Sequence, residues 1–344
     1  MLDRLSGMPY PSPEPSPTPP GWPHCGHGTI PEDPVGCRGI HVPGHTACLA
    51  HLADADRAAY LSGLTPGTDI DHRGTTFTEP LLNALLEALR DPATGHPRLG
   101  FAQFESATFQ GHAQFESATF ERGAGFGSAT FHDIARFESA NFHDDARFRR
   151  ANVKSNAWFE SANFQSDAGF ESANFQRNAE FRSVTFRGVA AFESANFHGE
   201  ARFRSANFQH GAWFESANFR GIAGFGSATF RGVAAFESAN FRGVARFGSA
   251  TFRGLAAFES ANFHDDARFR SANFHDDARF RSVNFHGEAR FRSANFQHGA
   301  WFESATFQRN SRFESATFQG DAGFEEAVFL ISRQLSGRWC APIG

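Results

Sequence analysis

The stretch HGEARFRSANFQHGAWFESANF, residues 198 to 219, returns at residues 286 to 307 with one letter changed. It holds two copies of an eleven-residue pattern, A-x-F-x-S-A-[NT]-F-x-x-x, which runs without a gap through residues 102–329. The first Phe is present in all 21 units, and the second is replaced only once, by Val153. Ala stands two residues before each Phe, with three exceptions: Val184, Val283 and Ser311. Such regularity indicates a repeating unit in which each inward position accepts one kind of side chain.

An eleven-residue period also corresponds to three turns of an α-helix, so a helical structure has to be considered first. At 3.6 residues per turn the two Phe of one unit would lie about 140° apart, which leaves no narrow apolar stripe. Most units also carry Gly, Asn or Thr, which are poor helix formers. In an extended chain, by contrast, residues i and i+2 share a face, so Ala and Phe of each A-x-F point the same way. The pattern therefore predicts an all-β repeat protein.

Each unit supplies two short extended sides, A-x-F and A-[NT]-F, separated by corners rich in Ser, Gly, Asn and Asp, which suit turns. Two successive units would close a four-sided coil with four Phe and four Ala inside. Coils of this kind stack at strand spacing, about 4.8 Å, so that each backbone bonds to the coils above and below. The sequence therefore predicts a β-solenoid over residues 102–329.

The repeats resemble the pentapeptide-repeat family, whose unit is A-[DN]-[LF]-x-x. The resemblance covers residues 102–329 and implies a right-handed quadrilateral β-helix. Every second side carries one extra residue, giving 5+6 in place of 5+5, a spacing that is similar to that of a Phe-rich subclass. The Cys- and His-containing block before the repeats is similar to the segment that precedes them in actinobacterial members. Some members of the family imitate the acidic surface of DNA and occupy topoisomerases.

The chain before and after the repeats divides into three further parts. Residues 1–23 are rich in Pro and are expected to form a disordered tail. Residues 24–101 form a Cys- and His-containing region with two predicted helices. Residues 330–344 are a C-terminal tail or cap that would cover the last coil incompletely. Because an uncovered solenoid end can recruit another chain, homodimerisation through the C-terminal end is an expectation.

The two helices are predicted at residues 45–64 and 78–91. In the second, Thr78 is a suitable N-cap and Pro80 suits the first turn. Five leucines of this segment fall on one face at helical spacing: Leu81, Leu82, Leu85, Leu86 and Leu89. We expect this helix to cap the first coil of the solenoid.

The region before the repeats holds the strongest candidate site. Cys25, Cys37, Cys48 and His51 form a Cys₃His set, with His27 as an alternative ligand. A small loop-rich segment gains folding free energy from zinc, so a structural Zn site is one interpretation. The other is a loop with free Cys and polar His, because the spacings match no standard C-x-x-C pair.

The repeats themselves offer no catalytic residue. The triplet HDD at 143–145, 264–266 and 275–277 places His beside carboxylates, but other units have RGV or QRN in the same corner, so a solvated turn is favoured. The recurrent Ser has no base at a fixed place beside it, which argues against nucleophilic catalysis. We therefore predict that the protein is not an enzyme.

Charge on the repeats distinguishes two functions. Residues 102–329 carry 24 Arg and Lys against 26 Asp and Glu, so mimicry of DNA, which needs a strongly one-signed face, is not favoured. If two units form one coil, five Arg stack on one face: Arg202, Arg246, Arg268, Arg290 and Arg312. Four further Arg lie two residues along from positions of this column: Arg182, Arg204, Arg270 and Arg292. The opposite face stacks five Glu and two Trp: Glu171, Glu193, Glu215, Glu237 and Glu259, then Trp213 and Trp301.

The Arg column could bind phosphates or an acidic partner, or could be a solvated surface paired with Glu in adjacent rows. The two Trp could dock a partner or pack against a neighbouring Arg stem. We predict an elongated protein-interaction scaffold with an unknown protein partner. The alternative is a nucleic-acid-directed protein, acting by topoisomerase interference or by phosphate binding through the Arg face.

The sequence predicts a cytoplasmic location without membrane contact. No apolar run is long enough to cross a bilayer, and the Pro-rich start has no signal-peptide h-region. Four Cys in a long cytosolic chain argue against a disulfide framework, which leaves metal binding or free thiols.

Overall fold

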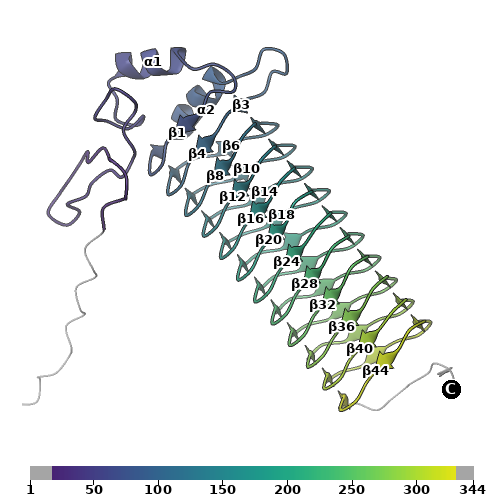
Figure 1. Ribbon diagram of the computed structural model, residues 1–344. Helices are drawn as coiled ribbons and strands as arrows, with labels where there is room; N and C mark the ends of the chain where they lie inside the picture. The colour runs from purple at the N-terminus through teal and green to yellow at the C-terminus, as the bar shows by residue number, and fades with distance from the viewer. Residues whose placement is uncertain (1–17, 331–344) are drawn as a thin grey trace, which may run out of the picture.

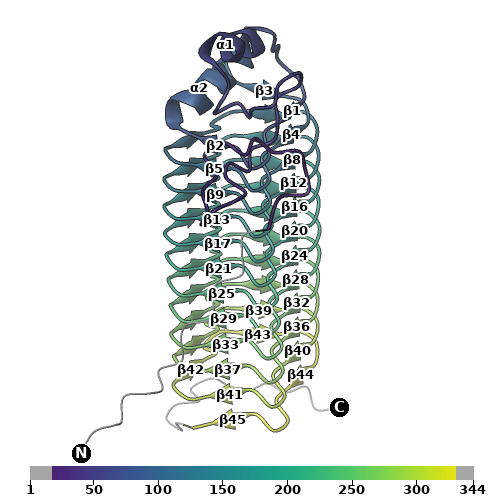
Figure 2. The ribbon, with the colours of Figure 1, turned by 90° about the vertical axis from the view of Figure 1, so that its left-hand side faces the viewer.

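The computed structural model describes residues 18–330. The chain forms a four-sided β-solenoid whose coils stack into a rod, with two helices at its N-terminal end (Figures 1 and 2). The predicted Pro-rich tail at 1–23 lies mostly outside the described residues. The predicted C-terminal cap at 330–344 lies outside them from residue 331 onward, so the expected dimer contact at that end stays a prediction.

Every strand of the solenoid is two residues long, and strands stack in parallel on four sides. Within the repeats, each strand pairs with the strands two units before and two units after it, as in Ala113↔Ala135↔Ala157. Side 1 has twelve strands, β1 (Ile70–Asp71), β4 (Ala102–Gln103), β8 (Ala124–Gly125) and on to β44 (Ala322–Gly323). Side 2 has twelve, β2 (Thr76–Phe77), β5 (Thr108–Phe109) and on to β45 (Val328–Phe329). Side 3 has ten, β6 (Ala113–Gln114) to β42 (Ser311–Arg312), and side 4 eleven, β3 (Arg98–Leu99), β7 (Thr119–Phe120) and on to β43 (Thr317–Phe318). The predicted coil of two units is confirmed.

The interior consists of Phe and Ala from all four sides. Phe rings of successive coils stack face to face, as in Phe203 on Phe225, whose centroids lie 4.9 Å apart with planes 2° apart. Neighbouring rings within the rod meet edge to face, as in Phe203 and Phe214, 5.4 Å apart at 85°. Both geometries suit the quadrupole of an aromatic ring. Because each ring must fit rings above, below and beside it, the same side chain is needed at every level.

The recurrent Ser occupies a strained corner conformation. In the turn Phe214–Ala217, the Ala217 N–H donates to the Phe214 carbonyl, and Ser216 has φ 57°. A positive φ at the third turn residue normally requires Gly. The Ser216 N–H also donates to the carbonyl of Glu237 in the next coil at 2.9 Å, so the ladder of hydrogen bonds holds the corner in place.

The solenoid begins before the predicted boundary at residue 102. Ile70 pairs with Ala102 and Phe77 with Phe109, so residues 70–77, IDHRGTTF, are a divergent first unit. His72 fills the place of the first Phe and is fully buried. Gly74, with φ 65°, fills the place of Ser. The predicted start of the solenoid was therefore too late.

Helix α2 (Glu79–Ala88) interrupts this first coil. The Thr78 hydroxyl accepts the Leu81 N–H at the N-cap, and Leu82, Leu85 and Leu86 are buried in the core at the top of the rod. The first coil has no strand on side 3, and α2 instead packs against β6 at the start of that side. The Glu79 carboxylate also accepts a hydrogen bond from the Gln114 amide at 3.0 Å. The helix therefore takes the place of a missing strand.

Helix α1 (Asp54–Ser62) is shorter than the predicted helix at 45–64. Residues 45–53 form turns instead. The Arg57 guanidinium donates to the carbonyls of Leu49 and Leu52, which a longer helix would have bonded internally. Among residues 18–330, neither helix is long and apolar enough to cross a membrane.

Candidate metal centre and charged faces of the rod

Two of the candidate ligands lie on facing strands of an irregular hairpin. The Gly26 N–H donates to the Cys37 carbonyl and the Cys37 N–H to the His27 carbonyl, each at 2.9 Å. Gly26 and Gly36 have φ 63° and 62°, a conformation that lets the backbone bend sharply beside each Cys. The hairpin therefore brings Cys25 and Cys37 together although they are distant in the chain.

The other two ligands come from one turn. The His51 N–H donates to the Cys48 carbonyl at 2.9 Å, which folds Cys48-x-x-His51 into a turn, although this segment lies within the helix predicted over residues 45–64. Cys48 is buried, and His51 is exposed. The turn therefore presents both side chains to the hairpin.

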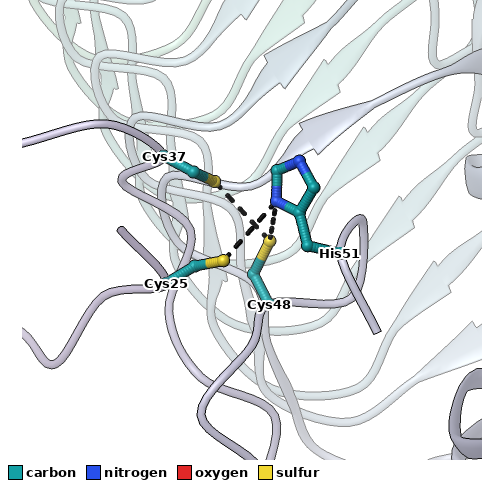
Figure 3. A group of neighbouring side chains, drawn as sticks. All are labelled: Cys25, Cys37, Cys48 and His51. Carbon is teal, nitrogen blue, oxygen red and sulfur yellow. Dashed lines mark hydrogen bonds between the residues drawn. The ribbon is translucent and has the colours of Figure 1, made fainter. Parts of the chain in front are cut away.

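All four ligand atoms converge, as Figure 3 shows. Cys25 Sγ lies 3.5 Å from His51 Nδ1, Cys48 Sγ 3.4 Å from the same nitrogen, and Cys37 Sγ 3.7 Å from Cys48 Sγ. No pair of the four atoms is more than 4.8 Å apart. Tetrahedral zinc with its usual bond lengths requires edges of about 3.8 Å between two sulfurs and about 3.6 Å between sulfur and nitrogen. The donor set therefore fits a tetrahedral metal ion.

The thiols of Cys37 and Cys48 differ in how readily they ionise. A hydrogen bond with Cys48 lowers the pKa of the Cys37 thiol to about 5, and the same contact together with burial raises the pKa of Cys48. Thiolate is the form that binds a metal. The hydrogen bond between the two thiols therefore favours the thiolate form of Cys37.

His27, the alternative ligand, lies beside the cluster and outside the four-residue set. Its ring stacks on that of His51, with centroids 4.2 Å apart and planes 24° apart. It therefore flanks the ligand ring.

Sequence reasoning missed the residues that tie this centre to the rod. A Cβ on Gly39 would meet the Cys48 Cβ at 2.6 Å, so Gly39 permits the close approach of hairpin and turn. The Ile40 N–H donates to the Arg73 carbonyl of the first coil at 2.8 Å. The Arg73 guanidinium also lies 5.1 Å from the centre of the Trp22 ring. The Cys₃His cluster is thereby attached to the divergent first unit.

Side 3 carries the predicted Arg column. Near the C-terminal end of the rod these side chains line a groove of about 830 Å³. The Arg groove comprises Arg246, Arg268, Arg270, Arg290, Arg292 and Arg312, and Glu314 and Ser315 also line it near its C-terminal end. Its floor includes Gly226 and Gly248, where no side chain fills the space.

Two Arg from the predicted column differ in their contacts. Arg290 pairs with Glu288 at 2.6 Å and with Asp266 at 3.2 Å in the adjacent corner, so the groove is partly neutralised. Arg202 lies outside the groove, because Gly224 and Gly226 separate it from Arg246, and it pairs with Glu180 and Glu200.

Side 1 carries the predicted row of Glu. The Glu ladder comprises Glu171, Glu193, Glu215, Glu237 and Glu259, one from each of five successive coils. In each of them one carboxylate oxygen, Oε2, is buried without a hydrogen-bond partner among the described residues. Burial raises the pKa of Glu193, Glu215 and Glu237. These carboxylates are therefore poorly compensated inside the chain.

The ladder does not extend over the whole side. In the coils directly before and after the ladder, Arg149 and Arg281 occupy the position that Glu occupies in the ladder. The described part of side 1 therefore has no continuous acidic face.

The two predicted Trp lie on side 1 with different surroundings. The Arg281 guanidinium lies 5.6 Å from the centre of the Trp301 ring. Trp213 is 38% exposed, and no Arg lies over it among the described residues. Of these two Trp, only Trp301 therefore packs against an Arg side chain.

The His-containing corners stack as the coil length predicts. The rings of His264 and His286 lie face to face, 4.9 Å apart. Partial burial is the main cause that lowers the pKa of His264, and the charges of His286 and Arg242 act in the same direction. The stack is a surface array on the rod.

Comparison with known proteins bears on the repeats. A profile of the family described as Pentapeptide repeats (9 copies) matches residues 126–173, 170–217, 236–283 and 280–328, more than half of the chain. Among solved structures, the chain is similar to HetL, described as a pentapeptide repeat protein involved in heterocyst differentiation regulation from the cyanobacterium Nostoc sp. strain PCC 7120. The two are 13% identical with a TM-score of 0.16, over 81% of this chain and 98% of that chain. No curated protein matches the chain.

Proposed function

The chain belongs to the pentapeptide-repeat family, and on that premise we propose that it is a non-enzymatic scaffold for protein interactions that acts in the cytoplasm. The observation that supports the proposal is that all coils share one interior, whereas the outward side chains differ from side to side. Every coil buries the same Phe and Ala, whereas side 3 bears the Arg groove and side 1 the Glu ladder. A rod of this kind presents charges at a fixed repeat to whatever binds along it.

The Cys₃His centre has a structural role in this proposal. Zinc bound by Cys25, Cys37, Cys48 and His51 would hold hairpin and turn together with all four positions occupied by protein ligands. The contact from Ile40 to Arg73 would pass that rigidity to the first coil. The metal would therefore fix the N-terminal end of the scaffold.

The groove favours a second candidate function, binding of nucleic-acid phosphates. Six guanidinium groups in one groove are suited to phosphate oxygens. Binding of this kind weakens steeply with salt, because counterions are released from the nucleic acid.

The scaffold is tested with the full chain immobilised and exposed to a lysate of its native host. The test variant is R268Q/R290Q/R292Q, and the matched control is R231Q/R253Q, whose changes lie on the corner that follows side 4. We expect a defined set of proteins to be retained by the wild type and the control and lost by the test variant. Equal retention by all three proteins would show that the groove is not a docking surface.

The nucleic-acid candidate is tested with a labelled duplex of about 20 base pairs, by fluorescence anisotropy across a salt series. Binding that falls steeply with salt, and that the test variant loses, would support this candidate. The absence of binding at low salt would exclude it.

A further inference from the structure

The Arg groove and the Glu ladder lie on opposite sides of one rod. Each coil runs through sides 1, 2, 3 and 4 in order, as the sequence of β4, β5, β6 and β7 shows, so sides 1 and 3 face away from each other (Figure 2). A groove and a ladder of one chain therefore cannot meet. They can meet only between two chains.

The two arrays share one axial repeat. Rings behind the ladder, such as Phe214 and Phe236, lie 4.9 Å apart, and rings behind the groove, such as Phe269 and Phe291, also lie 4.9 Å apart. Charges on both sides are therefore repeated at the coil rise, about 4.8 Å. An Arg groove laid on a Glu ladder stays in register at every level.

Within residues 18–330, the ladder has almost no ion-pair partners, although Glu193, Glu215 and Glu237 each form a backbone hydrogen bond. Glu171, Glu193, Glu215 and Glu237 form no ion pair with any described residue, and Glu259 reaches Arg279 only at 3.9 Å. Like charges stacked at this spacing repel one another. Guanidinium groups from outside would relieve that repulsion.

The groove retains unused charge as well. Arg246, Arg270 and Arg292 form no ion pair with a described residue, whereas Arg268, Arg290 and Arg312 pair with corner carboxylates.

Trp213 marks the middle of the ladder side. It belongs to β24 (Ala212–Trp213), two residues before Glu215, and stands between Ala191 and Ala235 of the neighbouring coils. The other three Trp of residues 18–330 each have a guanidinium within 5.6 Å of the ring centre, namely Trp22, Trp158 and Trp301. Trp213 is the only one of the four without such a cation, so its ring can accept an Arg from another chain.

We propose that the Arg groove of one copy docks on the Glu ladder and Trp213 of a second copy, so that the rods associate side by side. This inference rests on the proposed scaffold function and names its partner as the chain itself. A guanidinium of the groove pairs with a carboxylate at each shared level, and one lies over Trp213.

The spacing favours a second copy over the other polyanions that could enter the groove. Phosphates of one strand of duplex DNA repeat at about 3.4 Å along the axis, so they lose register with the coils after one level. Side chains on one face of an extended peptide repeat at about 6.6 Å and lose register as well. A second copy of this solenoid, in contrast, presents acidic groups at the groove's own repeat.

The geometry of such a contact is open-ended. Each copy keeps an unused groove and an unused ladder after one contact, so the interface is heterologous and adds further copies. In a parallel pair the copies are staggered along the axis, since the groove begins at β30 (Ala245–Arg246) and the ladder already at β16 (Ala168–Gly169).

The test uses the full chain in sedimentation velocity at about 50 mM and about 500 mM salt, where the screening length differs severalfold. Two variants each remove one partner surface, R268Q/R290Q/R292Q and E193Q/E215Q/E237Q, and R231Q/R253Q is the control. Circular dichroism and thermal unfolding establish that each is folded. Neutral Gln is used so that no new complementary charge arises.

We expect the wild type and the control to form a concentration-dependent series of oligomers at low salt that dissociates at high salt. Each surface variant alone is expected to remain a monomer. An equimolar mixture of the two variants is expected to form dimers and nothing larger, because one intact groove meets one intact ladder. Trp213→Ala is expected to weaken the wild-type association by several fold.

The proposal would be overturned by a wild type that stays monomeric at low salt up to about 100 μM. A contact made of several ion pairs should form at lower protein concentrations than that. Dimers absent from the variant mixture would overturn it too. Binding of duplex DNA by a wild type that does not self-associate would reassign the groove to nucleic acid. None of these three results would contradict the scaffold, which fails if the groove variant retains the same lysate proteins as the wild type.

Discussion

The ring of Phe214 lies face to face with that of Phe236, one coil later, with centroids 4.9 Å apart and planes 2° apart. The same ring stacks on Phe192 of the preceding coil at 4.8 Å. Removing one ring from the middle of such a column therefore leaves a cavity that its neighbours cannot fill.

We expect Phe214→Ala to lower the free energy of unfolding by about 3–5 kcal/mol. Phe214→Leu keeps most of the volume, and its cost should be clearly smaller. Thermal and chemical unfolding followed by circular dichroism measure both. Equal effects of the two substitutions would show that the stacked ring itself, and not the volume it fills, supplies the stability.

Val153 is the natural gap in another column. It pairs with Phe131 and Phe175 in the adjacent coils, where every other level of that position holds Phe. We expect Val153→Phe to raise the free energy of unfolding by about 1–2 kcal/mol, because the added ring fills space that the repeat provides. A lower unfolding temperature would mean that the surrounding coils have closed around the smaller side chain.

Zinc binding by the Cys₃His cluster would have a definite stoichiometry. Elemental analysis of intact protein is expected to give about one equivalent of zinc, and Cys37→Ser is expected to lose it, because a structural site needs all four ligands. His27→Ala is the matched control and should keep the metal, since His27 stacks on His51 outside the ligand set. Less than about half an equivalent in the wild type would contradict the site.

The buried His72 predicts an acid-sensitive first coil. Burial lowers its pKa to about 4 from an ordinary value of 6.5, so the unfolded chain takes up this proton at higher pH than the folded chain. The stability from neutral His72 is complete above about pH 6.5 and is lost as the pH falls toward 4, by about 1.4 kcal/mol per pH unit at most.

His72→Phe restores the residue of the repeat and removes this titration. Unfolding temperatures of wild type and variant are compared at pH 7.5 and 4.5. The Cys₃His cluster is the same in both proteins, so its own pH dependence cancels in the comparison. We expect the variant's advantage to be larger at pH 4.5. An advantage independent of pH would show that His72 takes up its proton at the same pH in the folded protein as in the unfolded chain.

The Glu ladder predicts the opposite pH dependence. Burial, and for Glu193 and Glu237 also neighbouring carboxylates, raises the pKa of Glu193, Glu215 and Glu237, so their charged forms destabilise the fold. This penalty is complete above the raised pKa values and is relieved as the pH falls through them. Below the unfolded value of about 4.3 both states are protonated. E193Q/E215Q/E237Q in dilute solution should therefore unfold at a higher temperature than the wild type at pH 7, with the difference disappearing near pH 4.

Part of the fold is readable from periodicity alone. A period of eleven with Ala and Phe two residues apart allows only a strand-like face, and two units close a coil, so the interior and the stacking of Arg202, Glu215 and His264 with their neighbours follow. The first coil is not readable in this way. His72, Gly74 and Thr75 replace Phe, Ser and Ala, and the inserted helix α2 breaks the two-unit spacing.

By itself the sequence determined the repeat, the buried side chains and the identity of four metal-binding candidates, because these depend on residue type and spacing. The coil of two units was an expectation that the strand pairing confirmed. Only the tertiary structure decided whether Cys25 and Cys37 reach Cys48 and His51, because that convergence depends on a hairpin and a turn held together at Gly39. It also decided that Arg202 stands apart from the groove and that Trp213 lacks a cation, because glycine gaps and ion pairs between coils set the environment of each outward side chain.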